Sequence, residues 1–146
     1  YCSEWFELNE ESPYMLLVTD IRDDKKLINQ NGDNKLDFRE IINLKRSSVP
    51  AITHIDYSAR IQTVDGKYNP RYHKLISRFN ELTNCPIIVN TSFNIRGEPI
   101  VCSPSDAFKC FMGTELDNLV IGNLLLVKSD QNSELLNDYK NLYGKD

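Results

Sequence analysis

The sequence predicts one α/β domain, because strand-like apolar runs alternate with segments of helical periodicity along its 146 residues. The run PIIVNTS (86–92) opens almost continuously apolar, which is typical of a strand covered on both faces. The segment 69–84 repeats its apolar residues every three or four positions, as an amphipathic helix does. With 40% hydrophobic residues, the chain is long enough for one core and too short for two comfortable ones.

Two further strand-like segments are expected in the first half of the chain. YMLLVTDI (14–21) is an apolar run with strand-favouring residues. Residues 22–49 are polar and contain an Asn-Gly turn signal, so we interpret them as a variable insert. Residues 51–65 alternate as strand residues do, with a break expected at 56–58.

The predicted helix over 69–84 has recognisable start signals. Asn69 is placed to cap the first turn, and Pro70 suits the first helical position. Its apolar side chains fall on one face, formed by Tyr72, Leu75, Ile76, Phe79 and Leu82.

The last third of the chain predicts three more elements. A helix begins at Ser103, which forms a capping box with Asp106. A strand follows over 118–128, with a bulge at Gly122-Asn123, and a helix over 132–144 ends the chain.

Charge and composition exclude several classes of partner. The net charge is −4 and the pI about 5.2, so no global positive field favours nucleic acid or an anionic membrane surface. Any anion must be captured by local groups. No apolar run approaches the ~20 residues of a spanning helix, and the first residues are not signal-like, so we expect a soluble, cytoplasmic protein. The four cysteines form no CxxC pair and are expected to be reduced.

Residues 29–40 resemble the loop of a calcium-binding EF-hand. Oxygen-bearing side chains occupy loop positions 1, 3, 5 and 9, and Glu40 occupies position 12. The first ligand is Asn29 rather than Asp, and Asn34 stands where the sharp turn needs Gly. No partner hand exists in the sequence. A solvated loop entering a short helix is therefore favoured, and a calcium-responsive module stays as the alternative.

The segment THIDYSARIQTV carries the first polar cluster. His54, Asp56, Ser58 and Arg60 share one parity, so an unbroken strand would place them on the same face. Such a face is either a solvent-facing edge or the lining of a groove. In the second case Arg60 offers a bidentate fork to phosphate or carboxylate.

The segment NTSFNIRGEP carries the second polar cluster, at the carboxyl end of an apolar strand where α/β sheets place ligands. Asn90 alone would also be explained by a turn. Two clusters that contain Arg beside a sheet favour an anionic ligand, such as a nucleotide or an acyl phosphate. The cluster comprises Asn90, Thr91, Ser92, Asn94, Arg96 and Gly97.

These two blocks, together with SPYMLLV and NPRYHKLISRFNELTNCPIIV, resemble the carboxy-terminal domain of the O-carbamoyltransferases. That group includes nodulation-type and antibiotic-tailoring enzymes. The resemblance runs from about Ser12 to Leu125 and is weakest in the polar insert. It implies a YrdC-like fold, a twisted, mixed open sheet with flanking helices whose open face binds ATP. The YrdC-like signature Ser-x-Asn-x-x-Gly reappears here from Ser92 to Gly97.

The resemblance implies a two-step reaction. This domain would join carbamoyl phosphate and ATP into carbamoyl adenylate with loss of pyrophosphate, aided by Mg²⁺. An amino-terminal domain of the same polypeptide, of the ASKHA type and holding a metal, would then pass the carbamoyl group to a hydroxyl-bearing small molecule.

The resemblance also implies roles for the polar residues. The catalytic set would be Arg60 and Arg96 as anion clamps, with Ser92 and Asn94 orienting phosphate or carbamoyl. His54 would contact ligand or be a hydrogen-bonded structural histidine. The remaining substrate- or nucleotide-binding residues would be Asp56, Ser58, Asn90, Thr91 and Gly97.

The chain differs from a whole family enzyme in what precedes it. The amino-terminal domain and a Lys/Arg-rich segment that would supply the first strand of the sheet are absent from these 146 residues. We therefore expect residues 1–146 to be one domain, truncated at its amino terminus, from a longer two-domain enzyme and catalytically incomplete in isolation. A nucleotide-binding module without catalysis is the competing interpretation.

Overall fold

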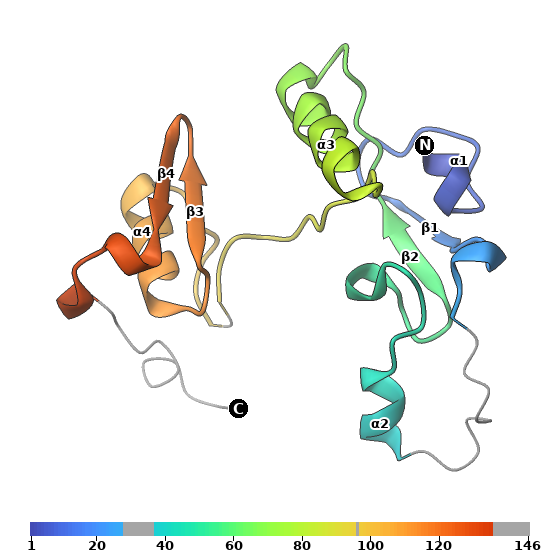
Figure 1. Cartoon of the computed structure of the whole chain (residues 1–146), viewed down its shortest axis with the longest axis horizontal. Coiled ribbons are helices and arrows are strands. Elements are labelled where there is room, and N and C mark those ends of the chain that lie inside the picture. Colours follow the sequence, from blue (N-terminus) through green and yellow to red (C-terminus); the bar gives the residue numbers. More distant parts are fainter. Residues whose placement is uncertain (28–36, 96, 136–146) are drawn as a thin grey trace. The chain divides into compact units, whose positions relative to one another are not determined.

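The computed structural model describes residues 1–27, 37–95 and 97–135, and it divides the chain into two compact units, 1–89 and 90–146. Helices and antiparallel strand pairs are present in both (Figure 1), which confirms the α/β class. Each unit is described by itself. The expectation of one domain stays a prediction.

Unit 1 (residues 1–89) is built around a pair of antiparallel strands, β1 (Leu17–Asp20) and β2 (Ser58–Ile61). Leu17 lies opposite Ile61 and Asp20 opposite Ser58. The helices of this unit are α1 (Cys2–Trp5), α2 (Phe38–Asn43) and α3 (Pro70–Thr83), with 3-10 turns at Asp23–Lys25 and Pro50–Ile52.

One face of this strand pair packs on the core of unit 1, and the other face is open. Ala59 and Ile61 are buried, whereas Val18 and Arg60, which lie opposite each other, are exposed. This alternation is usual for an antiparallel pair with one wet face. The core cluster comprises Phe6, Leu8, Ile21, Ala59 and Ile61.

The strands of unit 1 are shorter than the sequence predicts. The expected strand 14–21 begins only at Leu17, because residues 13–15 form a turn in which Met15 has a φ of 56°. The expected strand 51–65 is reduced to β2, since Pro50–Ile52 is a 3-10 turn. The predicted break is confirmed: residues 55–57 form a turn, and Tyr57 has a φ of 64°.

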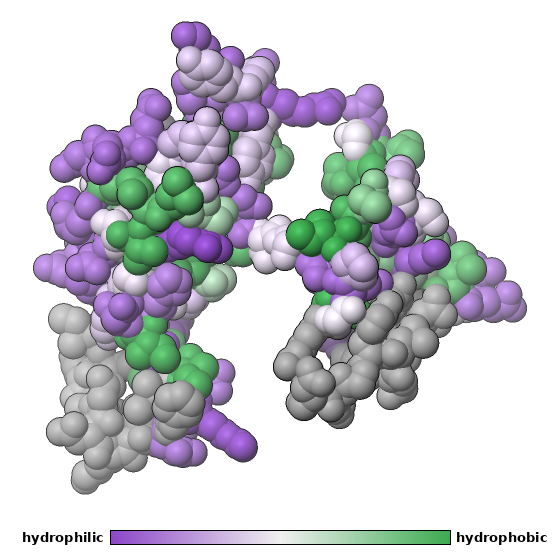
Figure 2. Space-filling model, turned by 180° about the vertical axis from the view of Figure 1, so that it is seen from behind, coloured by the Kyte–Doolittle hydropathy of each residue, from purple (hydrophilic) through white to green (hydrophobic). Residues whose placement is uncertain are grey.

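Helix α3 confirms the predicted helix and differs in two details. Asn69 occupies the N-cap position, yet its side chain makes no capping hydrogen bond, and the helix ends at Asn84 in the left-handed region with a φ of 59°. The apolar face is also largely uncovered: Leu75 is 58% and Leu82 69% exposed. Exposed apolar residues occur elsewhere as well, and Figure 2 shows hydrophobic residues reaching the surface.

The predicted strand over 86–92 is wrong in the structure. Residues 85–91 have no regular secondary structure, although Ile87 packs against the core of unit 1. A strand requires a hydrogen-bonded neighbour, and neither of the two strand pairs in the described residues includes this run.

Unit 2 (residues 90–146) combines α4 (Pro104–Gly113) with a hairpin of β3 (Asn118–Ile121) and β4 (Leu124–Val127). The expected single bulged strand over 118–128 is therefore wrong. Gly122, with a φ of 59°, and Asn123 form a two-residue turn, and Ile121 lies opposite Leu124. Positive φ at the first turn residue is typical of tight hairpins. The core of this unit comprises Ala107, Phe111, Met112 and Leu119.

The predicted helix over 132–144 lies mostly outside the described residues. Of these, residues 132–135 are described, and Ser133–Leu135 form a 3-10 turn. Within the described residues, no helix is long and apolar enough to cross a membrane.

Candidate functional site

Three of the predicted site residues meet in a hydrogen-bonded cluster beside β2. The turn at 55–57 folds His54 back, so its Nδ1 lies 2.9 Å from the Ser58 hydroxyl oxygen. That hydroxyl donates to Asp56 Oδ1 over 2.7 Å, and the Ser58 backbone N–H donates to the same oxygen over 3.0 Å. Asp56 and Ser58 thus form an Asx-turn, in which Asp bonds the backbone two residues on.

Asp56 accepts the hydrogen bonds that Ser58 donates within this cluster. Hydrogen bonds from the Ser58 side chain and backbone lower the pKa of the Asp56 carboxyl, and the nearby His54 ring adds to the effect. Asp56 is therefore a carboxylate at neutral pH. Ser58 is only 6% exposed, whereas His54 and Asp56 are exposed. The sequence signal for this arrangement was the Asp-x-Ser spacing.

Arg60 projects from the open face of β2. It lies opposite Val18 in the strand pair, and among the described residues no carboxylate forms an ion pair with it. Its charge is therefore available to an anion in solution. Arg60 and Ser58 have the same parity on β2, as predicted, although Ser58 is buried and Arg60 is exposed. Asp56 belongs to the turn at 55–57, and His54 precedes that turn.

The second cluster lies on the loop at the start of unit 2. Asn90, Thr91 and Ser92 are exposed. The Asn94 side-chain amide donates to the carbonyl oxygens of Ile95 (3.1 Å) and Glu98 (2.9 Å), so this amide group closes the turn.

Gly97 occupies a conformation that the loop needs. Its φ of 83° lies in the region that favours glycine. The Glu98 backbone N–H donates to the Ile95 carbonyl over 3.1 Å, which completes the turn. Arg96 lies outside the described residues. The two predicted clusters belong to different units, so each cluster is described by itself.

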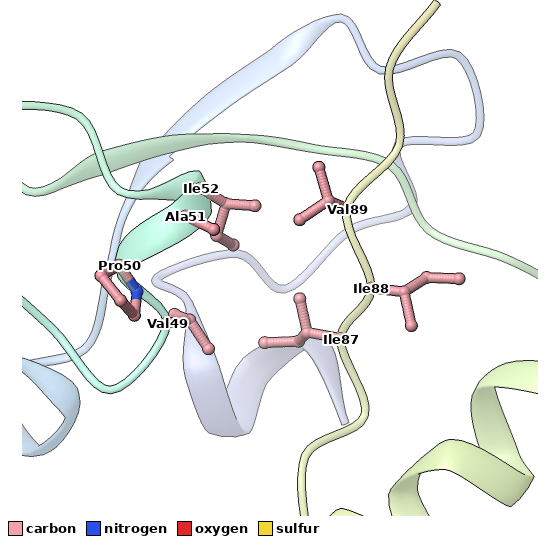
Figure 3. A pocket seen from close by; sticks show the side chains of 7 residues that line it. All are labelled: Val49, Pro50, Ala51, Ile52, Ile87, Ile88 and Val89. Carbon is pink, nitrogen blue, oxygen red and sulfur yellow. The ribbon is translucent and has the colours of Figure 1, made fainter. Parts of the chain in front are cut away.

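An apolar hollow of about 120 Å³ opens in unit 1 next to the chain segments that lead to these clusters. In Figure 3 the side chains of Ile87 and Val89 point toward the segment 49–52, whereas that of Ile88 points away from it. One segment ends two residues before His54, and the other ends one residue before Asn90. The lining residues are Val49, Pro50, Ala51, Ile52, Ile87, Ile88 and Val89.

Two charged side chains that the sequence does not single out have a buried terminal atom. Glu98 Oε2 and Arg46 Nη2 are buried and have no hydrogen-bond partner among the described residues. Arg46 Nη1 donates to the carbonyl oxygens of Ile42 and Leu44 at the end of α2, each over 3.3 Å. Nothing in the local sequence signals that either atom is buried.

The predicted calcium loop lies mostly outside the described residues. Of its last positions, Glu40 Oε2 accepts the Asp37 backbone N–H over 2.8 Å at the start of α2. Among the residues that the structure describes, no group of three His, Cys, Asp or Glu side chains could hold a metal. Calcium binding by 29–40 stays a prediction.

Comparison with known proteins places the chain in a family. Residues 1–128 match the family described as Carbamoyltransferase C-terminus. The chain is 52% identical over 128 residues to the uncharacterised protein sll1178 of Synechocystis sp., covering 88% of this chain and 21% of that protein. It is 40% identical over 129 residues to nodulation protein NolO of Bradyrhizobium diazoefficiens, covering 86% and 20%.

A named enzyme is also among the relatives. The 3'-hydroxymethylcephem-O-carbamoyltransferase of Streptomyces clavuligerus is 37% identical over 79 residues, covering 53% of this chain and 15% of that enzyme. The chain belongs to the carbamoyltransferase C-terminal family. It spans about a fifth of the length of its first two relatives, and the matched residues include both polar clusters.

Proposed function

We propose that this domain binds ATP and carbamoyl phosphate and forms carbamoyl adenylate for transfer to a hydroxyl acceptor. The observation that carries the proposal is the exposed Arg60 guanidinium, without an ion-pair partner among the described residues, inside a motif of a carbamoyltransferase family. Because the chain as a whole is acidic, an anionic substrate needs such a local cation.

The chemistry of the step explains why Arg and amide groups would be needed. A carbamate oxygen forms a bond to the α-phosphorus of ATP as the bond to pyrophosphate breaks. Starting from carbamoyl phosphate, mass balance also requires one water and releases phosphate. Since all reacting groups are anionic, the protein contributes mainly by positioning them and neutralising their charge.

Each residue of the expected catalytic set would have its own role. Arg60 would clamp phosphate oxygens bidentately, as guanidinium groups do, and Arg96 would do the same from the second cluster. The exposed Ser92 hydroxyl would donate to phosphate or carbamoyl oxygen. Asn94 would act through its turn, because its amide N–H groups already bond Ile95 and Glu98.

The apolar hollow supports a site for the base of the nucleotide. At about 120 Å³ it is smaller than the roughly 300–1,000 Å³ of pockets that enclose whole drug-sized ligands. A flat ring system is the part of ATP that suits such a lining. Mg²⁺ would arrive with the phosphates, since this ion usually binds through substrate phosphates, waters and one or two carboxylates.

The transfer step would need the rest of the polypeptide. The relatives are about five times longer than the matched region, which leaves room for the proposed ASKHA-type, metal-holding domain. That domain would carry the carbamoyl group to a hydroxyl-bearing small molecule.

Calorimetric titration with MgATP, with and without carbamoyl phosphate, tests the proposal. We expect Arg60→Ala and Arg96→Ala each to weaken binding by about 1.5 kcal/mol or more, the value of a hydrogen bond to a charged group. Arg60→Lys should recover only part of the loss, because an ammonium group lacks the bidentate fork. Arg78→Ala is the matched control, since Arg78 pairs with Glu81 on α3.

Three outcomes would contradict the proposal. MgATP binding that is insensitive to both Arg60→Ala and Arg96→Ala would place the nucleotide elsewhere. No binding by this chain, repeated with a version extended at its amino terminus, would remove the adenylating role. Binding without pyrophosphate release by the extended version would instead favour a nucleotide-binding module.

A further inference from the structure

The hydrogen atoms of the His54 cluster can be assigned from chemistry alone. The Ser58 hydroxyl has one hydrogen and two close neighbours, Asp56 Oδ1 at 2.7 Å and His54 Nδ1 at 2.9 Å. An ionised carboxylate can only accept hydrogen bonds. The hydroxyl hydrogen therefore points to Asp56, and the short contact to His54 is satisfied only if Nδ1–H is the donor.

The orientation of Asp56 is itself held in place. Its Oδ1 accepts the backbone N–H of Ser58 over 3.0 Å in addition to the hydroxyl. The order of donation thus runs from His54 to Ser58 to Asp56. In a neutral imidazole with hydrogen on Nδ1, the Nε2 atom is an acceptor.

We propose that Asp56 and Ser58 are positioning residues that hold His54 with Nε2 unprotonated, so that His54 receives a hydrogen-bond donor of the ligand. This revises the expectation that Asp56 and Ser58 contact ligand directly, and it decides for ligand contact at His54, where two interpretations stood open. Ser58 is 6% exposed and its hydroxyl hydrogen is already committed. Asp56 Oδ1 already accepts two hydrogen bonds from Ser58, whereas the ring of His54 is exposed and its Nε2 is not used within the cluster.

The ligand chemistry follows from this polarity and rests on the function proposed above. Phosphate oxygens at neutral pH are acceptors, so a neutral His54 cannot serve as a phosphate clamp, unlike Arg60. The donors of the proposed substrates are the ribose hydroxyls and the amino group of the nucleoside, and the amide of carbamoyl phosphate. His54 would therefore recognise one of these N–H or O–H groups.

Nitrogen-15 NMR of the side chains reads the tautomer directly. The chain contains only two histidines, His54 and His73, so its spectrum after selective ¹⁵N-histidine labelling is simple. Spectra of the whole 146-residue chain would be recorded at alkaline pH, where imidazole is neutral. We expect His54 to show a protonated Nδ1 and an acceptor-type Nε2, with His73→Asn giving the assignment. A protonated Nε2 in the unsubstituted chain overturns the proposal.

A pair of variants at position 56 tests the part played by the carboxylate. In Asp56→Ala the Ser58 hydroxyl loses its acceptor and can donate to Nδ1, so the fixed tautomer should be lost. In Asp56→Asn the backbone N–H of Ser58 keeps an amide oxygen in place, so the tautomer should persist. An unchanged tautomer in Asp56→Ala overturns the positioning role.

Separate additions identify the donor. Adenosine or carbamoyl phosphate should shift the Nε2 signal of His54, and the one that does so identifies the substrate that supplies the donor. Inorganic pyrophosphate, which offers acceptors, should leave it unchanged. A shift with pyrophosphate alone, or with none of the three while MgATP still binds, overturns the ligand assignment. If MgATP does not bind at all but the tautomer is fixed, the proposed function fails and the positioning pair stands.

Discussion

At the scale of residues, Ser103 and Asp106 show how a local pattern becomes a structure. Ser103 Oγ accepts the Asp106 backbone N–H over 3.1 Å, and Asp106 Oδ2 accepts the Ser103 backbone N–H over 3.1 Å. The predicted capping box is thus confirmed at the start of α4. Both partners lie within one helical turn, so no distant contact was needed to foresee it.

Removing the cap should destabilise α4. We expect Ser103→Ala to cost about 1 kcal/mol, the usual loss when a Ser cap becomes Ala. Protection of the α4 amides against hydrogen exchange would measure it. Ser105→Ala is the control, because Ser105 is exposed in the same turn. Equal losses in both variants would mean that the cap contributes nothing.

The stability of α4 should also depend on pH through Asp106. The hydrogen bond from the Ser103 hydroxyl holds the pKa of the Asp106 carboxyl below its usual value. The stabilisation is therefore fully present above the unfolded pKa of about 3.9 and is lost as the pH falls through the lower folded pKa. The stability difference between the unsubstituted chain and Asp106→Asn, measured from pH 6 to pH 2, should shrink toward acid. A constant difference would contradict this.

At the scale of elements, the predictions succeed where a segment determines its own conformation. The helices α3 and α4 and the break at 55–57 follow from periodicity, capping and turn residues. The run 86–92 fails as a strand because β structure requires a partner that the segment itself does not specify. The strand over 118–128 fails because Gly122-Asn123 allows either a bulge or a hairpin turn, and pairing of its two halves decides.

The uncovered face of α3 gives a test at this scale. Leu75 and Leu82 are more than half exposed, so Leu75→Ala and Leu82→Ala should each change the free energy of unfolding by less than about 0.5 kcal/mol. Ile61→Ala, in the core of unit 1, should cost about 2–5 kcal/mol. Urea unfolding followed by the fluorescence of Trp5, the single tryptophan, reports on unit 1. A core-sized loss at Leu75 or Leu82 would show that this face is covered in solution.

At the scale of the whole molecule, each unit has its own core cluster. Each unit contains two of the four cysteines. Cys2 and Cys85 lie in unit 1, and Cys102 and Cys110 lie in unit 2. Burial raises the pKa of the Cys2 and Cys110 thiols, and Glu98 raises that of Cys110 further. Since the thiolate is the reactive form, thiol reactivity measures how closed each unit is.

Iodoacetamide labelling followed by mass spectrometry should give the order in which the four cysteine thiols react. We expect the exposed Cys102 to react first and the buried Cys110 to react last, only when unit 2 opens. Cys102→Ser should remove the fastest phase and leave the others unchanged. Labelling of Cys110 as fast as Cys102 would contradict a closed core in unit 2. All four thiols should react in urea without a reducing agent.

As with the fold, one part of the candidate site could be predicted from the sequence and another part depends on the structure. The sequence alone pointed to both polar clusters and to the carbamoyltransferase resemblance, because motif residues and their spacing are properties of the chain. In an unbroken strand, their parity would place His54, Asp56, Ser58 and Arg60 on one face. In the structure the turn at Tyr57 folds the first two back, so Arg60 alone projects from the open strand face while Ser58 is buried.

By itself, the sequence determined the α/β class, the two long helices and the family, since these depend on residue types within a few positions or on motifs. Only the tertiary structure decided which apolar runs pair as strands and that the apolar face of α3 is exposed. It also decided that the Ser58 hydroxyl lies between His54 and Asp56, within hydrogen-bonding distance of both. The physical reason is that pairing, burial and proton direction depend on which atoms lie within about 3–4 Å of one another. Periodicity along the chain does not specify those distances.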